Sequence, residues 1–403
     1  MEAFQKLNKE EKGQAFAAAG NQLGLPAYII EKDFHVTVVL GCLFGPIWQQ
    51  LKAGNTHDPF VFKGGTTLSK VYSVIERMSE DIDLALSMSF LGYPEPDQES
   101  PNQREKKRLP HLKKAAETFT QNKLLSMLQT ELDKAAEGYS VSIAVDTEDA
   151  LVVNYPKLCE EYDADAYIKP RVLVESGGRA AQLPNAWHMI KPMVASVAEE
   201  ANVETNVMTL SINRTFFEKV TAVHAFINQK KIESRSSRHL YDIVKIALSH
   251  PEVVTDTAML VSVVEHKKKY FRAGAAKYDL ATQAELRLVP ATEEQYKAFI
   301  NDWGKMQDMF ADSPPVFSEL ISQLDRLERL INCCVTFPAD KVIDLLIEHD
   351  INYELIAKIY PLLRSHNINN AHSISLRLSN MKKSTSQDNW DSEMREILQS
   401  CIN

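Results

Sequence analysis

Residues 60–86 constrain the fold of this chain more than any other stretch, because they combine a strand, a tight turn, a helix and a second strand. The apolar run FVF predicts a short strand that ends at Lys63. Gly64 and Gly65 then predict a tight turn, and Thr66 opens a helical stretch. Exposed backbone N–H groups and the positive end of a helix dipole attract anions. The turn is therefore a candidate cradle for phosphate.

Two carboxylates follow about fifteen residues beyond the turn, where Asp81-Ile82-Asp83 begins the second strand. Because side chains alternate between the faces of a strand, Asp81 and Asp83 are expected on one face, with Ile82 directed into the core. Like charges held this close repel, and a divalent cation relieves the repulsion. Alone, each motif is commonly just a turn or a solvated strand end. Their order along the chain indicates a site for a nucleoside triphosphate and its magnesium ions.

A second informative stretch covers residues 213–249, where a basic link joins two expected amphipathic helices. The first helix carries Lys219, and the second begins near Arg238 and carries Asp242. Taken alone, Lys219 is typical of a surface lysine, and Asp242 of a charge near a helix N-terminus. A lysine can also neutralise phosphate as a compact cation that a nearby carboxylate fixes in place.

In combination, these stretches resemble the nucleotidyltransferase core of the AbiEii/AbiGii toxin family, part of the polymerase-beta-like nucleotidyltransferase superfamily. The pattern extends over residues 15–332, whereas the specific motifs occupy only about fifty residues. The matching positions are Gly64-Gly65-Thr66, Arg77-x-Ser79, Asp81-x-Asp83, Glu218-Lys219 and Arg238-x-x-x-Asp242.

The resemblance implies a role for each of these motifs. Asp81 and Asp83 are expected to bind Mg²⁺, or Mn²⁺ in its place, and the Gly-Gly-Thr turn is expected to hold the triphosphate. Lys219 is expected to reach the triphosphate and Asp242 to support the catalytic site. The expected nucleotide contacts are Lys63, Gly64, Gly65, Thr66, Arg77, Ser79, Lys219 and Arg238.

A third metal-binding carboxylate is expected on the strand beside the acidic pair, as the resemblance to the superfamily implies. Residues 168–176 predict such a strand, with Val174 and Glu175 on opposite faces. Glu175 is the candidate ligand, and a solvent-facing strand end is the alternative. Asp163 and Asp165 are rival acids in a polar turn.

A charged element lies in the helix expected over residues 28–44. Glu31-Lys32-Asp33 resembles the Glu-Lys-Asp-aromatic element found near the N-terminus of the toxin family. These residues are interpreted as a charged first helical turn, and contact between Lys32 and the nucleotide is the alternative.

The composition of the 403 residues, 44% hydrophobic and 25% charged, is that of a soluble globular protein with two or three domains. No apolar run approaches a membrane span, and the start MEAFQKLNKE is unlike a secretory signal. The five scattered cysteines lack metal-binding spacing, so reduced thiols and a cytoplasmic location are expected. With a net charge of −9, any nucleic-acid contact requires a local basic surface.

We predict an α+β fold in which a small mixed nucleotidyltransferase sheet with flanking helices precedes a mostly helical C-terminal part. The expected elements are helices over 8–22, 28–44 and 111–137, a loop or arm over 91–110, and strands over 139–145, 150–155, 168–176 and 207–212. The expected domains are a nucleotidyltransferase core with N-terminal helices over 1–212, a helical domain that completes the active site over 213–332, and a C-terminal helical extension over 333–403.

The resemblance implies a metal-dependent enzyme that moves a nucleoside monophosphate from an NTP to an acceptor hydroxyl. RNA, and tRNA in particular, is the expected acceptor. The expected role is that of the toxin in a bacterial toxin–antitoxin or abortive-infection phage-defence system, with a cognate antitoxin as partner. Three alternatives stay open: a protein or small-molecule acceptor, a nucleotide-binding protein without turnover, and a sugar-nucleotide glycosyltransferase. The glycosyltransferases share the Asp-x-Asp motif but lack the Gly-Gly-Thr turn upstream.

Overall fold

The computed structural model describes residues 4, 7–79, 81–145, 147–159, 169–198, 201, 204–232, 234–310 and 314–336. The chain divides into two compact units, which are described separately: Met1–Thr215 with Met306–Pro314, and Phe216–Lys305 with Pro315–Asn403. The sequence predicts a boundary after residue 212, but not the return of Met306–Pro314 to the first unit. From residue 337 onward, the predicted C-terminal extension lies outside the described residues.

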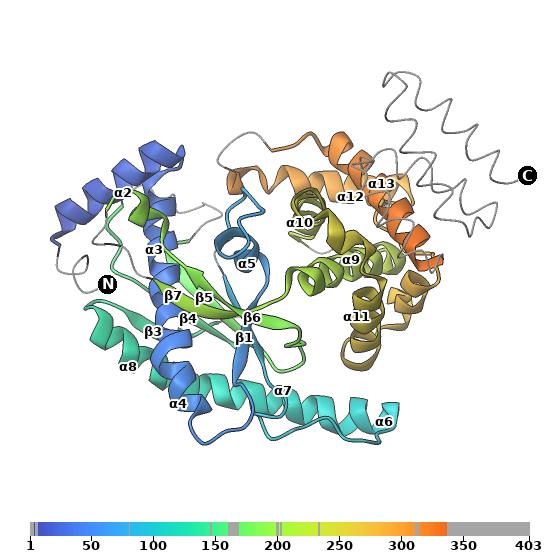
Figure 1. The fold of residues 1–403 in the computed structure, drawn as a ribbon, viewed down its shortest axis with the longest axis horizontal. Helices are drawn as coiled ribbons and strands as arrows, with labels where there is room; N and C mark the ends of the chain where they lie inside the picture. Colours follow the sequence, from blue (N-terminus) through green and yellow to red (C-terminus); the bar gives the residue numbers. More distant parts are fainter. Residues whose placement is uncertain are drawn as a thin grey trace, which may run out of the picture. The chain divides into compact units, whose positions relative to one another are not determined.

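The first unit contains a seven-stranded mixed sheet with the strand order β3-β4-β5-β2-β1-β7-β6 (Figure 1). Its strands are β1 (Phe60–Lys63), β2 (Ile82–Leu86), β3 (Ser140–Ile143), β4 (Ala150–Asn154), β5 (Arg171–Gly177), β6 (Asn185–Ile190) and β7 (Thr205–Leu210). β1 is parallel to β7 and β2 to β5, whereas the other neighbouring strands are antiparallel. The predicted α+β fold with a small mixed sheet is confirmed.

Helices cover the sheet through buried apolar side chains. The helical elements of this unit are α2 (Lys9–Leu23), α3 (Ala27–Cys42), η1 (Leu43–Ile47), α4 (Trp48–Lys52), α5 (Gly65–Lys70), α6 (Pro101–Gln103), η2 (Arg104–Arg108), α7 (Leu109–Thr118), η3 (Phe119–Leu124), α8 (Leu125–Ala135), η4 (Met193–Ser196) and η9 (Gln307–Met309). Helix α3 packs against β5, β7 and α8, and α7 packs against β5. Fully buried Phe62, Leu84 and Val174 belong to this core.

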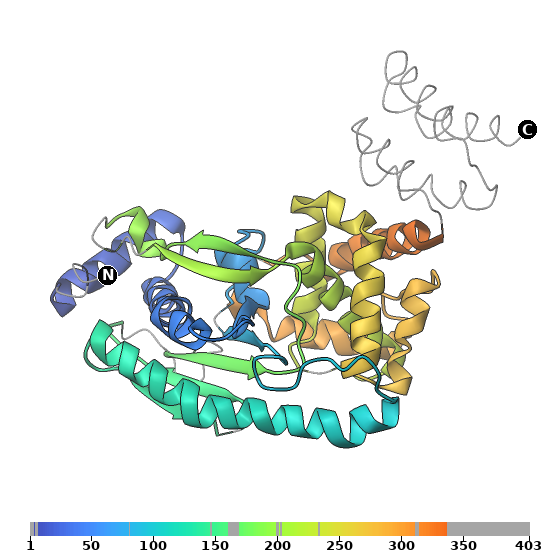
Figure 2. The ribbon, with the colours of Figure 1, turned by 60° about the horizontal axis from the view of Figure 1, so that its bottom comes forward.

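The predicted loop over 91–110 is wrong in its second half, because the chain becomes helical at Pro101. Ser100 caps this start: its hydroxyl accepts the Gln103 N–H, and the Gln103 side chain accepts the Ser100 N–H. Proline is well suited to the first helical position, since its missing N–H would have no partner there. The helix then continues to Ala135 through two π-helical segments, and Figure 2 shows it as one long helix along the sheet.

The predicted end of the 28–44 helix is also wrong. The chain stays helical to Lys52, with a kink where Gly45 takes backbone angles of φ −86° and ψ −107°. Glycine tolerates this conformation and thereby accommodates Pro46 inside the helix. A glycine–proline pair therefore bends this helix without ending it.

Strand β6 was not predicted from the sequence, and the predicted strand over 207–212 is observed two residues earlier, as β7. β6 forms one edge of the sheet and pairs antiparallel with β7 alone. An edge strand needs no apolar run, because one side of it has no neighbouring strand. Its outward-facing Trp187 and Met189 are 45% and 56% exposed.

The described secondary-structure elements of the second unit are all helical, as predicted for the C-terminal part. Its elements are α9 (Ile212–Gln229, starting in the first unit), α10 (Ser237–Ser249), η6 (Pro251–Thr255), α11 (Thr257–Tyr270), η7 (Gly274–Ala276), η8 (Tyr278–Thr282), α12 (Glu293–Gly304) and α13 (Phe317–Thr336). None of the described helices in either unit is both long and apolar enough to cross a membrane.

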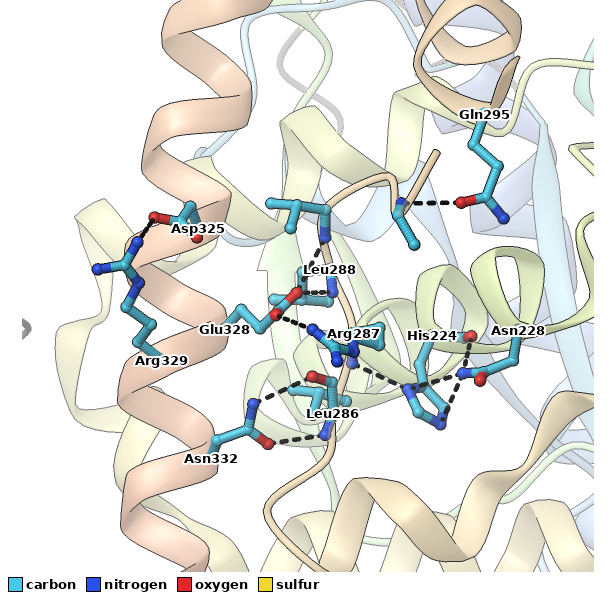
Figure 3. Close-up of polar contacts among 12 residues, drawn as sticks. His224, Asn228, Leu286, Arg287, Leu288, Gln295, Asp325, Glu328, Arg329 and Asn332 are labelled. Atoms are coloured by element: carbon cyan, nitrogen blue, oxygen red, sulfur yellow. Dashed lines mark hydrogen bonds and ion pairs between the residues drawn. The ribbon is translucent and has the colours of Figure 1, made fainter. Parts of the chain in front are cut away.

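A non-helical segment of the second unit is held by side chains from two helices (Figure 3). On α13, Glu328 accepts the Leu288 N–H at 2.6 Å, and Asn332 bonds both the N–H and the carbonyl oxygen of Leu286. On α9, His224 Nδ1 accepts the Arg287 N–H at 2.9 Å. These bonds replace the backbone pairing that a regular element would supply.

Candidate active site

The strand register aligns three charged residues across neighbouring strands. Lys63 on β1 pairs with Asp83 on β2, and Asp83 pairs with Glu175 on β5. Directly opposed residues project to the same face of a sheet, so the three side chains form a row. On β2 and β5, the alternate residues Leu84 and Val174 are fully buried in the core. The charged row therefore lies on the face opposite that core.

The charges in this row interact. The Lys63 ammonium lies 3.8 Å from a carboxylate oxygen of Asp83. The pKa of Glu175 is raised to about 7, first by desolvation and then by the negative charges of Asp83 and Asp81 and a hydrogen bond with Asp83. Glu175 is exposed as a whole residue, so this desolvation concerns the part of its carboxyl group that lies against the sheet. The negative charges of Asp83 and Asp81 therefore make ionisation of the Glu175 carboxyl group less favourable.

These acids do not form a complete metal-binding shell in their present side-chain conformations. Among the described residues, no three His, Cys, Asp or Glu side chains converge as a metal site. The charges of Asp83 and Asp81 nevertheless raise the pKa of Glu175, which places both carboxylates near it. Carboxylate oxygens are the ligands that Mg²⁺ prefers, so the donor set fits that ion once the side chains turn toward it. The rival acids Asp163 and Asp165 lie outside the described residues.

The glycine turn touches this row. Gly64 has φ +88°, in the region that favours glycine, and a Cβ at this position would lie 1.9 Å from Asp83 Oδ2. No side chain fits in that space unless Asp83 moves. The absence of a Cβ is what lets the turn approach the acidic strand.

The Gly65 position is equally tight, and residues predicted as nucleotide contacts surround it. A Cβ there would lie 2.6 Å from Ser79 Oγ and 3.1 Å from Arg77 Nη2. Thr66 is 1% exposed; its hydroxyl donates to the Asp81 carbonyl at 2.6 Å and lies 3.1 Å from the Ser79 hydroxyl. Arg77 is 2% exposed. These three side chains hold the turn against the acidic pair, which leaves backbone N–H groups as the candidate phosphate ligands of the turn.

Asp81 differs from its expected position, because β2 begins one residue later, at Ile82. The backbone carbonyl of Asp81 is therefore fixed by the bond from Thr66 rather than by the sheet. The preceding residues are fixed by the returning segment of the chain, where the Met78 N–H donates to the Met309 carbonyl at 2.7 Å. No local sequence signal near residue 78 indicates this partner.

The second unit contains the other predicted catalytic residues. Lys219 on α9 and Asp242 on α10 form an ion pair at 2.8 Å, with the carboxylate fully buried and the lysine side chain 9% exposed. A buried charge needs such a partner to offset its desolvation. Arg238, also on α10, is partly exposed. The structure thus brings Lys219 and Asp242 together.

Asp302 supports this pair, although no role was predicted for it from the sequence. It is 8% exposed and accepts the N–H groups of Arg235 at 2.6 Å and Ser237 at 2.8 Å, as well as the Ser237 hydroxyl. Ser237 begins α10, so a carboxylate from α12 caps the helix that carries Asp242. An acidic residue just before Trp303 was the only available signal.

Asp302→Ala is expected to destabilise the second unit by about 2–4 kcal/mol, because buried N–H groups would lose their acceptor. Urea unfolding measures this change. Asp325→Ala is the matched control, since it removes a 39%-exposed acid that pairs with Arg329 on α13. The control is expected to change stability by less than about 1 kcal/mol. Equal losses in both variants would contradict the capping role.

Comparison with known proteins identifies the family. No curated protein matches the chain. One similar solved structure is MenT4, a nucleotidyltransferase toxin from Mycobacterium tuberculosis H37Rv, at 13% identity and a TM-score of 0.37, covering 82% of this chain and 98% of that one. The family model described as "Nucleotidyl transferase AbiEii toxin, Type IV TA system" matches residues 47–324, well over half of the chain. The chain therefore belongs to the AbiEii family of nucleotidyltransferase toxins from type IV toxin–antitoxin systems, and it is a nucleotidyltransferase.

Proposed function

We propose that this enzyme moves a nucleoside monophosphate from an NTP to an acceptor hydroxyl with the help of Mg²⁺ or Mn²⁺. The observation that carries the proposal is the row of Lys63, Asp83 and Glu175, with the Gly64 turn in contact with Asp83. A divalent cation supplies charge neutralisation for the triphosphate and activates the attacking hydroxyl. The rest of the catalysis is positioning and electrostatics by the protein.

The first unit supplies the groups for the cation and the phosphates. Asp81, Asp83 and Glu175 would hold the cation through their carboxylate oxygens. The backbone N–H groups at Gly65 would bind phosphate oxygens, because first-turn N–H groups have no acceptor within their own helix. Lys63 would add positive charge next to Asp83.

The resemblance of the motifs implies a role for Lys219 and Asp242 at the leaving group. Lys219 would balance the charge of the departing pyrophosphate, and Asp242 would fix the direction of its ammonium group. Arg238 would add a further phosphate contact from the first turn of α10.

We further propose RNA, and tRNA in particular, as the acceptor, in a toxin whose action a cognate antitoxin counters in the cytoplasm. The support is the resemblance of the motifs to RNA-modifying relatives and the family match. The net charge of −9 requires that RNA meet a local basic surface. A protein or small-molecule hydroxyl is the competing acceptor.

A transfer assay tests the proposal. Purified protein is incubated with Mg²⁺, total bacterial RNA and each labelled NTP in turn, beside Asp81→Ala. Label in an RNA band that disappears in the variant supports the proposal and identifies the base and the acceptor. Label on protein instead would exclude RNA as the acceptor. Equal labelling by Asp81→Ala would contradict the proposed role of Asp81 in binding the metal ion.

The Mg²⁺ requirement is expected to depend on pH through Glu175, whose pKa is raised to about 7. Above pH 7 the carboxylate is ionised and ready to bind a cation, whereas below pH 7 it must first lose a proton. The Mg²⁺ concentration for half-maximal activity should therefore rise up to about tenfold per pH unit below 7. Titrations of activity with Mg²⁺ at pH 8, 7 and 6 measure this rise. Glu175→Gln should need more Mg²⁺ at every pH and show a flatter dependence.

A further inference from the structure

Three consecutive charged residues are buried inside the apolar helix α3. Glu31, Lys32 and Asp33 are 0%, 1% and 5% exposed. Burying one charge is costly, and burying three in a row requires a compensating partner for each. Because these residues are buried and lie in the second turn of α3, the expectation of a charged first helical turn is wrong, whereas contact between Lys32 and the nucleotide stays a prediction. These charges point into the protein.

Each of the three charges is bound to a different part of the first unit. Successive residues of a helix point about 100° apart, so neighbouring side chains reach different segments. Glu31 accepts the N–H groups of Leu158 at 2.6 Å and Cys159 at 3.2 Å. Lys32 donates to the carbonyl of Lys169, just before β5.

Asp33 reaches the helix of the glycine turn. One carboxylate oxygen accepts the Met193 N–H at 2.7 Å, and the other lies 2.5 Å from the ammonium group of Lys70, the last residue of α5. Both side chains of this ion pair are 5% exposed. Helix α5 is thus bonded at its start through Thr66 and at its end through Lys70.

A cavity borders one side of α5 near its end. This cavity of about 330 Å³ borders Ser69, Asp33, Arg77 and Ser79, with a lining that is otherwise mainly apolar. Beside such a cavity the side chains have few neighbours to resist a shift of the helix. The Asp33–Lys70 ion pair adds a restraint on the helix next to this cavity.

We propose that Asp33 is a positioning residue for nucleotidyl transfer: through Lys70 it holds α5 so that the Gly64–Thr66 turn stays in register with Asp83. The proposal rests on the proposed role of that turn in binding the triphosphate. Asp33 touches neither the turn nor the carboxylates of the row in any observed bond, so its effect passes through α5. Glu31 anchors residues 158–159 and has no observed bond to α5.

The test compares Asp33→Asn with Glu31→Gln, two buried neutralisations on the same helix. Hydrogen exchange at the α5 amides is measured first, because it requires no turnover. Asp33→Asn should speed exchange over residues 65–70 at least about tenfold, and Glu31→Gln should not. Equal exchange over these residues in the two variants would overturn the proposal, even if both are less stable than the parent protein.

The second readout is kinetic. Asp33→Asn should raise the KM for NTP about tenfold with a smaller change in kcat, while Glu31→Gln retains the parental KM. The double variant Asp33→Asn/Lys70→Met should raise KM no further than the worse single change, because both remove the same pair. Additive effects would exclude a shared role. If the parent protein turns over no NTP, the proposed function fails, and the exchange experiment still decides the role of Asp33.

Discussion

Asp83→Asn is expected to abolish nucleotidyl transfer, lowering turnover by at least about a thousand-fold. Asp83 is the central member of the charged row: it lies opposite both Lys63 and Glu175, and it contacts the space left by Gly64. Asparagine keeps the size of the side chain but removes the negative charge that a cation requires. Single-turnover measurements with labelled NTP would quantify the loss.

The same variant is expected to fold normally. Removing the Asp83 charge lowers the repulsion felt by Glu175, so the pKa of Glu175 should fall toward its ordinary range. Thermal unfolding should therefore show a midpoint no lower than that of the parent protein. Normal turnover by a folded Asp83→Asn enzyme would show that Asp83 has no catalytic role. If Asp83→Asn does not fold, the same measurement is made with Asp81→Asn.

Gly64→Ala is expected to reduce transfer by about a hundredfold or more, because a displacement of about 1 Å in a catalytic group can cost that much. The added Cβ would meet Asp83 Oδ2 at 1.9 Å, so the carboxylate or the turn must move. Either movement separates the candidate phosphate site from the candidate metal site. Steady-state kinetics with the acceptor that the transfer assay identifies would measure the effect.

Gly54→Ala is the matched control for backbone strain. Gly54 has φ +80°, close to the +88° of Gly64, but a Cβ there would meet nothing within 4 Å. Both substitutions place a side chain at a positive φ, but Gly64, with ψ −163°, also lies in a backbone region that is essentially restricted to glycine, at a cost of about 1–3 kcal/mol. Only the Gly64 substitution creates a clash with the acidic row. Similar activity losses in the two variants would show that strain, not contact with Asp83, explains the Gly64 effect.

The charged row and the turn form one site through the supporting contacts between them. Thr66, Arg77 and Ser79 lie between the glycine turn and Asp81, and the returning residue Met309 fixes the segment before them. Farther away, the Asp33–Lys70 pair fixes the other end of α5. A turn of two glycines has little rigidity of its own, so this support sets the distance between the candidate phosphate ligands and the candidate metal ligands.

Much of the fold could be predicted from the sequence because its signals are local. The apolar run before Lys63, the glycine pair and the alternation around Glu175 each reflect the preferences of a few adjacent residues. The same holds for the amphipathic helices that carry Lys219 and Asp242. Two elements were missed: edge strand β6, whose local signal is weak, and the helix after Ser100, whose capping box is a local signal that the prediction overlooked.

The sequence by itself determined which chemical groups this protein has and the order in which strand, turn, helix and acidic pair follow one another. The tertiary structure alone decided that Asp83 lies opposite Glu175, that Arg77 and Thr66 support the turn, and that Asp33 reaches Lys70. The physical reason is that register and buried polar contacts join residues far apart in the chain. Such contacts depend on the packing of whole elements, and no short stretch of sequence encodes them.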